Sequence, residues 1–182
     1  MNAVLFSFLF AVIHFALPDT AGLLHQDSEW AKSKAIVVFF TTTDCPISNG
    51  YIPEMNRIQA DYAKRGVAFY AVQADLTIPD ADVKKHAKDF GFAFPVLLDK
   101  KQVLVRATGA TAIPESAVLS NDGKVLYLGR IDDKVADFGK VRTTATAPDL
   151  RNALDAVLAG KPVAHPRTNA IGCTINLETV KK

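Results

Sequence analysis

Two hydrophobic patterns alternate along most of the chain and predict alternating strands and helices. Continuous apolar runs occupy residues 36–40 (IVVFF), 67–74 (VAFYAVQA) and 94–98 (FPVLL), and short runs of this kind are typical of buried strands. Apolar residues in the intervening segments recur at helical spacing instead. We therefore predict helices over residues 46–65 and 81–90, which makes the order strand, helix, strand, helix, strand.

The C-terminal part of the chain predicts an antiparallel end to the sheet. Residues 115–119 and 125–128 read as strands on either side of the turn sequence SNDG at 120–123, which favours a hairpin. Residues 129–147 have no clear period and predict a long loop, and residues 148–159 repeat apolar positions as a helix does. The expected fold is an α/β domain whose mixed sheet ends in an antiparallel hairpin and is flanked by helices.

The start of the chain is a separate apolar segment. Residues 1–17 (MNAVLFSFLFAVIHFAL) are apolar except for Asn2, Ser7 and His14, and small turn-forming residues follow. This pattern predicts a secretory signal peptide over residues 1–22, and a short buried helix or a membrane anchor are the alternatives. The run is short for a membrane span. We therefore expect an exported protein in the periplasm or another extracytoplasmic compartment.

Length and composition indicate one globular domain at residues 23–160, followed by a polar tail at 161–182. The chain has 182 residues, of which 49% are hydrophobic, and its formal net charge is +2. No basic block is present, so a nucleic acid is not an expected partner. The sequence has no phosphate-binding glycine loop and no serine-hydrolase elbow, the histidines are scattered, and we expect neither a cofactor nor a structural metal.

Cys45 is the leading candidate for chemistry. It follows the apolar run at 36–40 after a few small polar residues, and Pro46 suits the first turn of the helix that begins there. A thiol at this junction faces unpaired backbone N–H groups and the positive end of the helix dipole, which favour the thiolate. We therefore expect an ionised, reachable sulfur that acts as a nucleophile.

Cys173, in the tail, is the only other cysteine. Two cysteines are too few for a disulfide scaffold, but a nucleophilic sulfur needs a second thiol for resolution, and Cys173 is the only candidate within the chain. Glutathione or a partner protein could take its place, in which case Cys173 has no role. The sequence does not decide whether Cys45 and Cys173 meet.

Two stretches carry a resemblance to a known family. Residues 39–48 (FFTTTDCPIS) and 112–132 (AIPESAVLSNDGKVLYLGRID) make the chain resemble the thioredoxin-fold redoxins, within the alkyl hydroperoxide reductase/thiol-specific antioxidant, or peroxiredoxin-like, group. The resemblance covers about residues 35 to 159. It implies a thioredoxin-like fold and a cis Ile113–Pro114 bond whose backbone faces the reactive cysteine.

The residues around Cys45 differ from the thioredoxin pattern and from the peroxiredoxin pattern. Ser48 stands where thioredoxins have the second cysteine of Cys-x-x-Cys, so the motif cannot close its own disulfide. Thr42 matches the threonine of the peroxiredoxin pattern Pro-x-x-x-Thr-x-x-Cys, but Val38 replaces its proline. The resemblance implies a thiol-based oxidoreductase that reduces a disulfide or a peroxide, with a thiol reductant or a disulfide-bearing protein as its partner. Thr42 could hydrogen-bond the sulfur or cap the turn.

The negative charge of Asp44 should disfavour a thiolate at Cys45, so we expect a compensating cation. Arg130, just after the predicted hairpin, is our candidate, and a solvated surface arginine is the alternative.

Two other function classes remain open. One is a copper-delivery module, in which Cys45, Cys173 and His165 would supply soft ligands for Cu(I), although the chain has no Cys-x-x-x-Cys motif. The other is a non-catalytic interaction domain, which a buried and unreactive Cys45 would favour.

Overall fold

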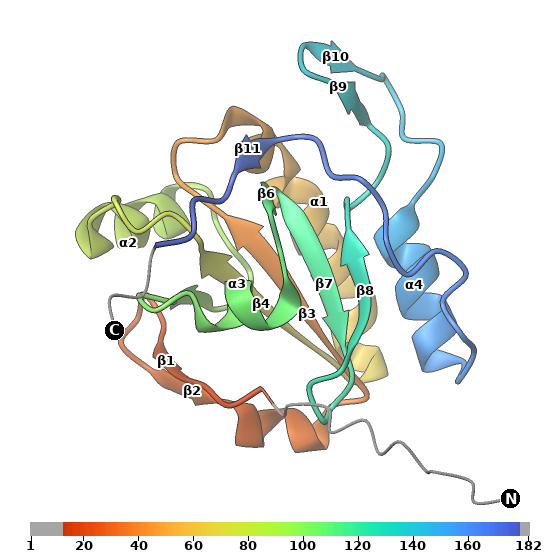
Figure 1. The fold of residues 1–182 in the computed structure, drawn as a ribbon, viewed down its shortest axis with the longest axis horizontal. Coiled ribbons are helices and arrows are strands. Elements are labelled where there is room, and N and C mark those ends of the chain that lie inside the picture. The colour runs from red at the N-terminus through yellow and green to blue at the C-terminus, as the bar shows by residue number, and fades with distance from the viewer. Residues whose placement is uncertain (1–12, 179–182) are drawn as a thin grey trace, which may run out of the picture.

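A five-stranded sheet in the order β5-β4-β3-β7-β8 forms the centre of the computed structural model, which describes residues 13–178 (Figure 1). The central strand β3 (Ala35–Thr41) runs parallel to β4 (Val67–Gln73) and antiparallel to β7 (Glu115–Leu119). Beyond these strands lie β5 (Val96–Leu98), parallel to β4, and β8 (Val125–Gly129), antiparallel to β7. This is the predicted thioredoxin-like fold, with a mixed sheet that ends in a hairpin.

Both faces of β3 are covered, which explains why its sequence is a continuous apolar run. On one face, the core contains side chains of α1 (Pro46–Tyr62), α2 (Asp80–Asp89) and α4 (Asp149–Leu158). The opposite face packs against α3 (Val103–Thr108) and the N-terminal segment. α1 continues into a short 3-10 helix, η2 (Ala63–Arg65).

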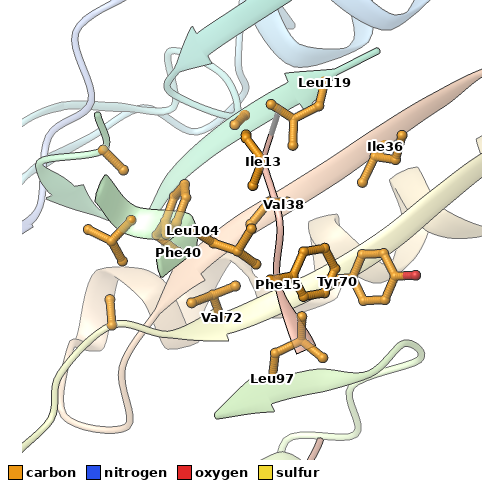
Figure 2. Packing of buried hydrophobic residues seen from close by; sticks show 14 of the residues in the cluster. Ile13, Phe15, Ile36, Val38, Phe40, Tyr70, Val72, Leu97, Leu104 and Leu119 are labelled. Carbon is orange, nitrogen blue, oxygen red and sulfur yellow. The ribbon is translucent and has the colours of Figure 1, made fainter. Parts of the chain in front are cut away.

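The N-terminal segment is part of the core from the first described residue. β1 (Ala16–Pro18) and β2 (Leu24–Gln26) form an antiparallel pair, and the 3-10 helix η1 (Asp27–Lys32) follows. Figure 2 shows Ile13 and Phe15 among the side chains that cover the sheet. Residues 13–22 therefore contribute to the fold, although the sequence assigns them to the signal segment.

The rest of the predicted signal segment, residues 1–12, lies outside the described residues. Within residues 13–178, no helix is long and apolar enough to cross a membrane. Export therefore stays a prediction.

The predicted loop at 129–147 contains a short hairpin, β9 (Val135–Asp137) and β10 (Lys140–Val141). The Asp133 carboxylate closes the segment, because it accepts hydrogen bonds from the backbone N–H groups of Thr146 and Ala147 at 2.6 and 2.8 Å. The backbone of this segment is thus held by hydrogen bonds to the Asp133 side chain, which a pattern of apolar positions does not reveal.

The tail runs back across the domain. After α4 it pairs with the edge of β8, where the Leu128 N–H donates to Pro166 O and the Thr168 N–H donates to Leu128 O. It then reaches β11 (Cys173–Thr174), which pairs antiparallel with β6 (Ala112–Ile113) at the end of the sheet (Figure 1). The docked tail brings Cys173 to the region of the sheet where α1 begins.

Candidate dithiol site

Cys45 is the N-cap residue of α1, directly before Pro46 at the first helical position. The Asn49 N–H donates to Cys45 O at 3.0 Å, and Asn49 Nδ2 donates to Thr43 O at 2.8 Å, so the first turn of the helix holds the loop that precedes the cysteine. The Cys45 side chain makes no capping hydrogen bond to the helix. Its sulfur nevertheless stands at the positive end of the helix dipole, as the sequence predicts.

The Cys45 side chain is fully buried, with 0% of its surface exposed. The thiol donates a 3.4 Å hydrogen bond to Ile113 O, and the Ile113–Pro114 peptide bond is cis. The expectation of a reachable sulfur is therefore wrong for this conformation. The docked tail contributes to this burial, because Cys173 interacts with the Cys45 side chain and Ile175 packs in the same cluster.

Cys173 lies beside Cys45. Its backbone pairs with Ile113, the residue whose carbonyl oxygen accepts the Cys45 hydrogen bond. Burial and the interaction with the Cys45 side chain raise the pKa of the Cys173 thiol to about 11, so it is protonated near neutral pH. Both thiols are free. The fold thus brings together two sulfurs whose proximity the sequence leaves undecided.

Two other predicted residues of the motif are buried in the same region. Thr42 Oγ1 accepts a 3.4 Å hydrogen bond from Gln73 Nε2, which links the turn to the end of β4. Ser48, at the position of the second thioredoxin cysteine, has 0% of its surface exposed. Within residues 13–178, its hydroxyl oxygen has no hydrogen-bond partner.

The structure does not place Arg130 at the sulfur. Its Nε donates a 2.7 Å hydrogen bond to Asp149 Oδ2, in the first turn of α4. Burial lowers the pKa of the Arg130 guanidinium, but the hydrogen bond and the negative charge of Asp149 act against burial, and the net effect is a raised pKa. Arg130 is therefore committed to the start of α4, and its predicted role beside Asp44 needs correction.

An ionisable group that the charge of Asp44 does influence is His86, on α2. Burial lowers the pKa of His86, and the negative charge of Asp44 acts in the opposite direction. His86 Nε2 is hydrogen-bonded to Asn49 Oδ1 at 2.9 Å, so the ring also contacts the first turn of α1. Sequence reasoning missed this histidine because a single histidine on a helix carries no motif.

The three ligands suggested for copper are not assembled. His165 lines a hollow next to Arg130 and the start of α4 instead of the two cysteines. Across the part of the chain that the structure describes, no group of three or more His, Cys, Asp or Glu residues could hold a metal ion. The donor set that the copper reading needs is therefore absent from the described fold.

A cleft of about 660 Å³ opens next to the cysteine, between α1 and the β9–β10 hairpin. Pro46 and Ile47 line the cleft on the side of α1, and Val135 and Val141 line it on the side of the hairpin. Deeper in the cleft, the Tyr51 hydroxyl donates a 2.6 Å hydrogen bond to Asp132. The start of α1 therefore has an open apolar flank, although the sulfur itself is covered.

The sequence profile of the redoxin family matches residues 11–147. The chain belongs to the redoxin family. The thiol-disulfide oxidoreductase ResA of Geobacillus thermodenitrificans is 30% identical over 143 residues, which cover 79% of this chain and 74% of that protein. These findings confirm the resemblance that the two sequence stretches indicate.

Solved structures agree with this membership. A hypothetical protein from Sinorhizobium meliloti is 31% identical, with a TM-score of 0.77 over 93% of both chains. A protein assigned as the thiol:disulfide interchange protein DsbE of Chlorobium tepidum is 27% identical, with a TM-score of 0.63, over 81% of this chain and 94% of that one. The ResA and DsbE relatives are named for thiol–disulfide chemistry, which supports a thiol-based redox function.

The two cysteines of this redoxin differ in their relation to the family match. Cys45 lies inside the matched residues 11–147, whereas Cys173 lies beyond them. The match also begins inside the predicted signal segment, in agreement with the packing of residues 13–22 on the sheet. The second sulfur is therefore brought to the site by the tail and not by α1, where Ser48 occupies the corresponding position.

Proposed function

We propose that this redoxin is a thiol–disulfide oxidoreductase whose redox pair is Cys45 and Cys173. One observation carries the proposal: the two free thiols lie against each other at the N-terminus of α1, although Cys173 belongs to the tail and Cys45 to the domain. The names of the relatives favour disulfide exchange over peroxide reduction, and Val38 in place of the peroxiredoxin proline favours the same choice. The expected substrates are disulfide-bearing proteins.

In the reducing direction, the Cys45 thiolate attacks one sulfur of the partner's disulfide. A mixed disulfide forms, and the other partner sulfur leaves as a thiolate that takes up a proton. Cys173 then loses its proton and attacks Cys45 Sγ, which releases the second partner thiol and forms the Cys45–Cys173 disulfide. Two electrons pass from the protein dithiol to the partner, and a thiol reductant restores the dithiol. The reverse sequence oxidises a partner dithiol.

The electrostatics favour this division of roles. Cys45 stands at the end of a helix dipole that stabilises negative charge, so it is suited to attack first. The Cys173 thiol stays protonated near neutral pH, partly because of Cys45. Burial is the largest cause of the raised pKa of Cys173, and only the smaller contribution from Cys45 is lost when Cys45 enters a mixed disulfide. Cys173 then ionises more readily than in the dithiol, while burial continues to raise its pKa.

Export is part of the proposal, since the apolar run begins before the residues that pack in the core and disulfides persist outside the cytoplasm. A leader that ends before Ile13 would leave the described fold complete. Cleavage after residue 22 would instead remove β1, whose Leu17 is buried in the core.

Trapping with glutathione disulfide tests the proposal. The reduced wild-type protein should form an intramolecular disulfide without a lasting adduct, whereas Cys173→Ser should accumulate one glutathionyl group on Cys45. Cys45→Ser should react slowly, and the matched control Ser48→Ala should behave as the wild type does. Mass spectrometry with peptide mapping distinguishes these products. The proposal would be contradicted if Cys173 in the Cys45→Ser protein were glutathionylated as fast as Cys45 is in the Cys173→Ser protein. A stable glutathione adduct on the wild type would contradict it as well.

Hydrogen peroxide provides a second arm of the same experiment. If peroxide forms the Cys45–Cys173 disulfide much faster than glutathione disulfide does, the chain is a peroxidase, and the preference for protein disulfides is wrong. In that case Cys45 is oxidised to a sulfenic acid, and attack by Cys173 releases water.

A further inference from the structure

The docked tail forms part of the cover over Cys45, because Cys173 interacts with the Cys45 side chain. β11 is only two residues long, and the Ile175 N–H adds one hydrogen bond to Thr111 O at 2.9 Å. Gly172 packs so closely on the strand below that a Cβ atom there would lie 1.8 Å from Ile113 O. The tail therefore fits over the nucleophile closely, but few backbone hydrogen bonds hold it there.

The side chains of Gln102 and Arg106 bind the tail just beyond this cover, where the Arg106 guanidinium donates hydrogen bonds to Glu178 O and, at 3.5 Å, to Gln102 Oε1. Gln102 Nε2 donates to Asn176 O at 2.8 Å, and Gln102 Oε1 accepts a hydrogen bond from the Glu178 N–H at 2.9 Å. Gln102 Nε2 also lies 3.3 Å from Ala74 O, the residue after β4. One amide thus joins the tail to the end of the central sheet.

The backbone of Gln102 is unusual. Its φ of +52° lies in the left-handed region, and within residues 13–178 it is the only non-glycine residue with a positive φ. The side chain is 1% exposed, so its amide is placed inside the protein by this conformation. A residue held in a sparsely populated conformation points to a function that needs it there.

We propose that Gln102 is a positioning residue, a latch that holds residues 172–178 over Cys45. With the latch closed, the tail shields the nucleophile and holds Cys173 against it. With the latch open, Cys45 is exposed to a partner. The shielding of Cys45 is inferred from the geometry alone. The role of the latch in the attack of Cys173 on a mixed disulfide at Cys45 rests on the proposed function.

Glutamine suits this role because its amide presents a donor and an acceptor together. The donor meets the carbonyl oxygen of Asn176 and the acceptor meets the N–H of Glu178, as a neighbouring strand would. A glutamate at this position keeps the shape but cannot donate to Asn176 O when it is ionised. A glycine keeps the left-handed backbone without strain and removes the amide. The two substitutions therefore separate the latch from the backbone conformation.

Alkylation of Cys45 with iodoacetamide tests the latch. In a Cys173→Ser background, where Cys45 is the sole thiol, Gln102→Gly and Gln102→Glu should raise the alkylation rate by about tenfold through easier local opening. Gly172→Ala should do the same from the other side of the cover, because its methyl group cannot fit against Ile113. The matched control is Asn169→Ala, at an exposed position of the tail.

A second readout keeps a structural effect apart from a positioning effect. In proteins that retain both cysteines, Gln102→Gly should make the Cys45–Cys173 disulfide about tenfold easier to reduce by glutathione, which corresponds to about 30 mV. The melting temperature of the reduced protein should change little. Alkylation rates that match the Asn169→Ala control in both Gln102 variants would overturn the latch, whatever the rate in Gly172→Ala. Faster alkylation supports it even if the wild type forms no internal disulfide, so failure of the proposed function is a separate result.

Discussion

Formation of the Cys45–Cys173 disulfide should strongly stabilise this redoxin against unfolding. The bond would close a loop of about 130 residues, and the loss of chain entropy in the unfolded state is then worth about 5 kcal/mol. Because this effect acts on the unfolded chain, the docking of the tail in the folded state does not remove it. For a domain of this size, each 1 kcal/mol corresponds to about 2–4 °C, so the melting temperature should rise by about 10–20 °C.

Calorimetry on the oxidised and the reduced protein measures this difference directly. Cys45→Ser and Cys173→Ser should each melt at the same temperature under oxidising and reducing conditions, because neither can close the loop. An oxidised wild type that contains the internal disulfide but melts within 2 or 3 °C of the reduced form, a small fraction of the expected shift, would refute the reasoning. It would mean that closing the bond distorts the folded state by nearly as much as it constrains the unfolded one.

Three further predictions concern single groups. The pKa of the Cys173 thiol is raised from 9.0 to about 11 in the folded protein, so the unfolded chain releases this proton at a lower pH. The unfolding free energy of the reduced protein should therefore fall as the pH rises from 9 to 11. Denaturant titrations should show a smaller fall for Cys173→Ser. Ser48→Ala removes a buried hydroxyl that lacks a partner in the described fold, and equilibrium unfolding should show a gain of about 1 kcal/mol, whereas a loss would mean that the hydroxyl is satisfied. Leu17→Ala should cost about 2–5 kcal/mol in the same assay, and a neutral result would show that the N-terminal strand is dispensable.

Local patterns were enough to predict the sheet and its helices. The run at 36–40 lies within β3, which has neighbours on both edges and buried side chains on both faces, and such a strand must be apolar throughout. Gly66, which directly follows the helix predicted over residues 46–65, has a φ of +93°, in the left-handed region that favours glycine at a helix end. The place of Cys45 at the start of α1 follows from the same two elements, because a strand that leads directly into a helix fixes the residue between them.

The parts of the site that the pattern could not predict depend on contacts between distant segments. β11 and β6 have two residues each, and no periodicity marks a strand so short. The grip of Gln102 on the tail is a side-chain contact across more than 70 residues, to which the spacing of apolar positions is insensitive. For Arg130 the sequence predicted a contact that the structure does not show. Its position after the hairpin suggested a role beside Asp44, but its guanidinium pairs with the carboxylate of Asp149 instead.

The burial of Cys45 does not by itself decide between a catalytic and a non-catalytic protein. The decision depends on which part of the protein buries the sulfur. A thiol beneath the central sheet would be exposed by global unfolding alone, and it would be inert on the time scale of a reaction. Cys45 instead lies against the tail, whose strand β11 has two residues and does not belong to the five-stranded sheet, so in the proposed latch the tail leaves while that sheet stays intact. Local opening of this kind costs far less than unfolding the domain. A fully buried sulfur is therefore compatible with a nucleophile here, because the segment that hides it also carries the second thiol.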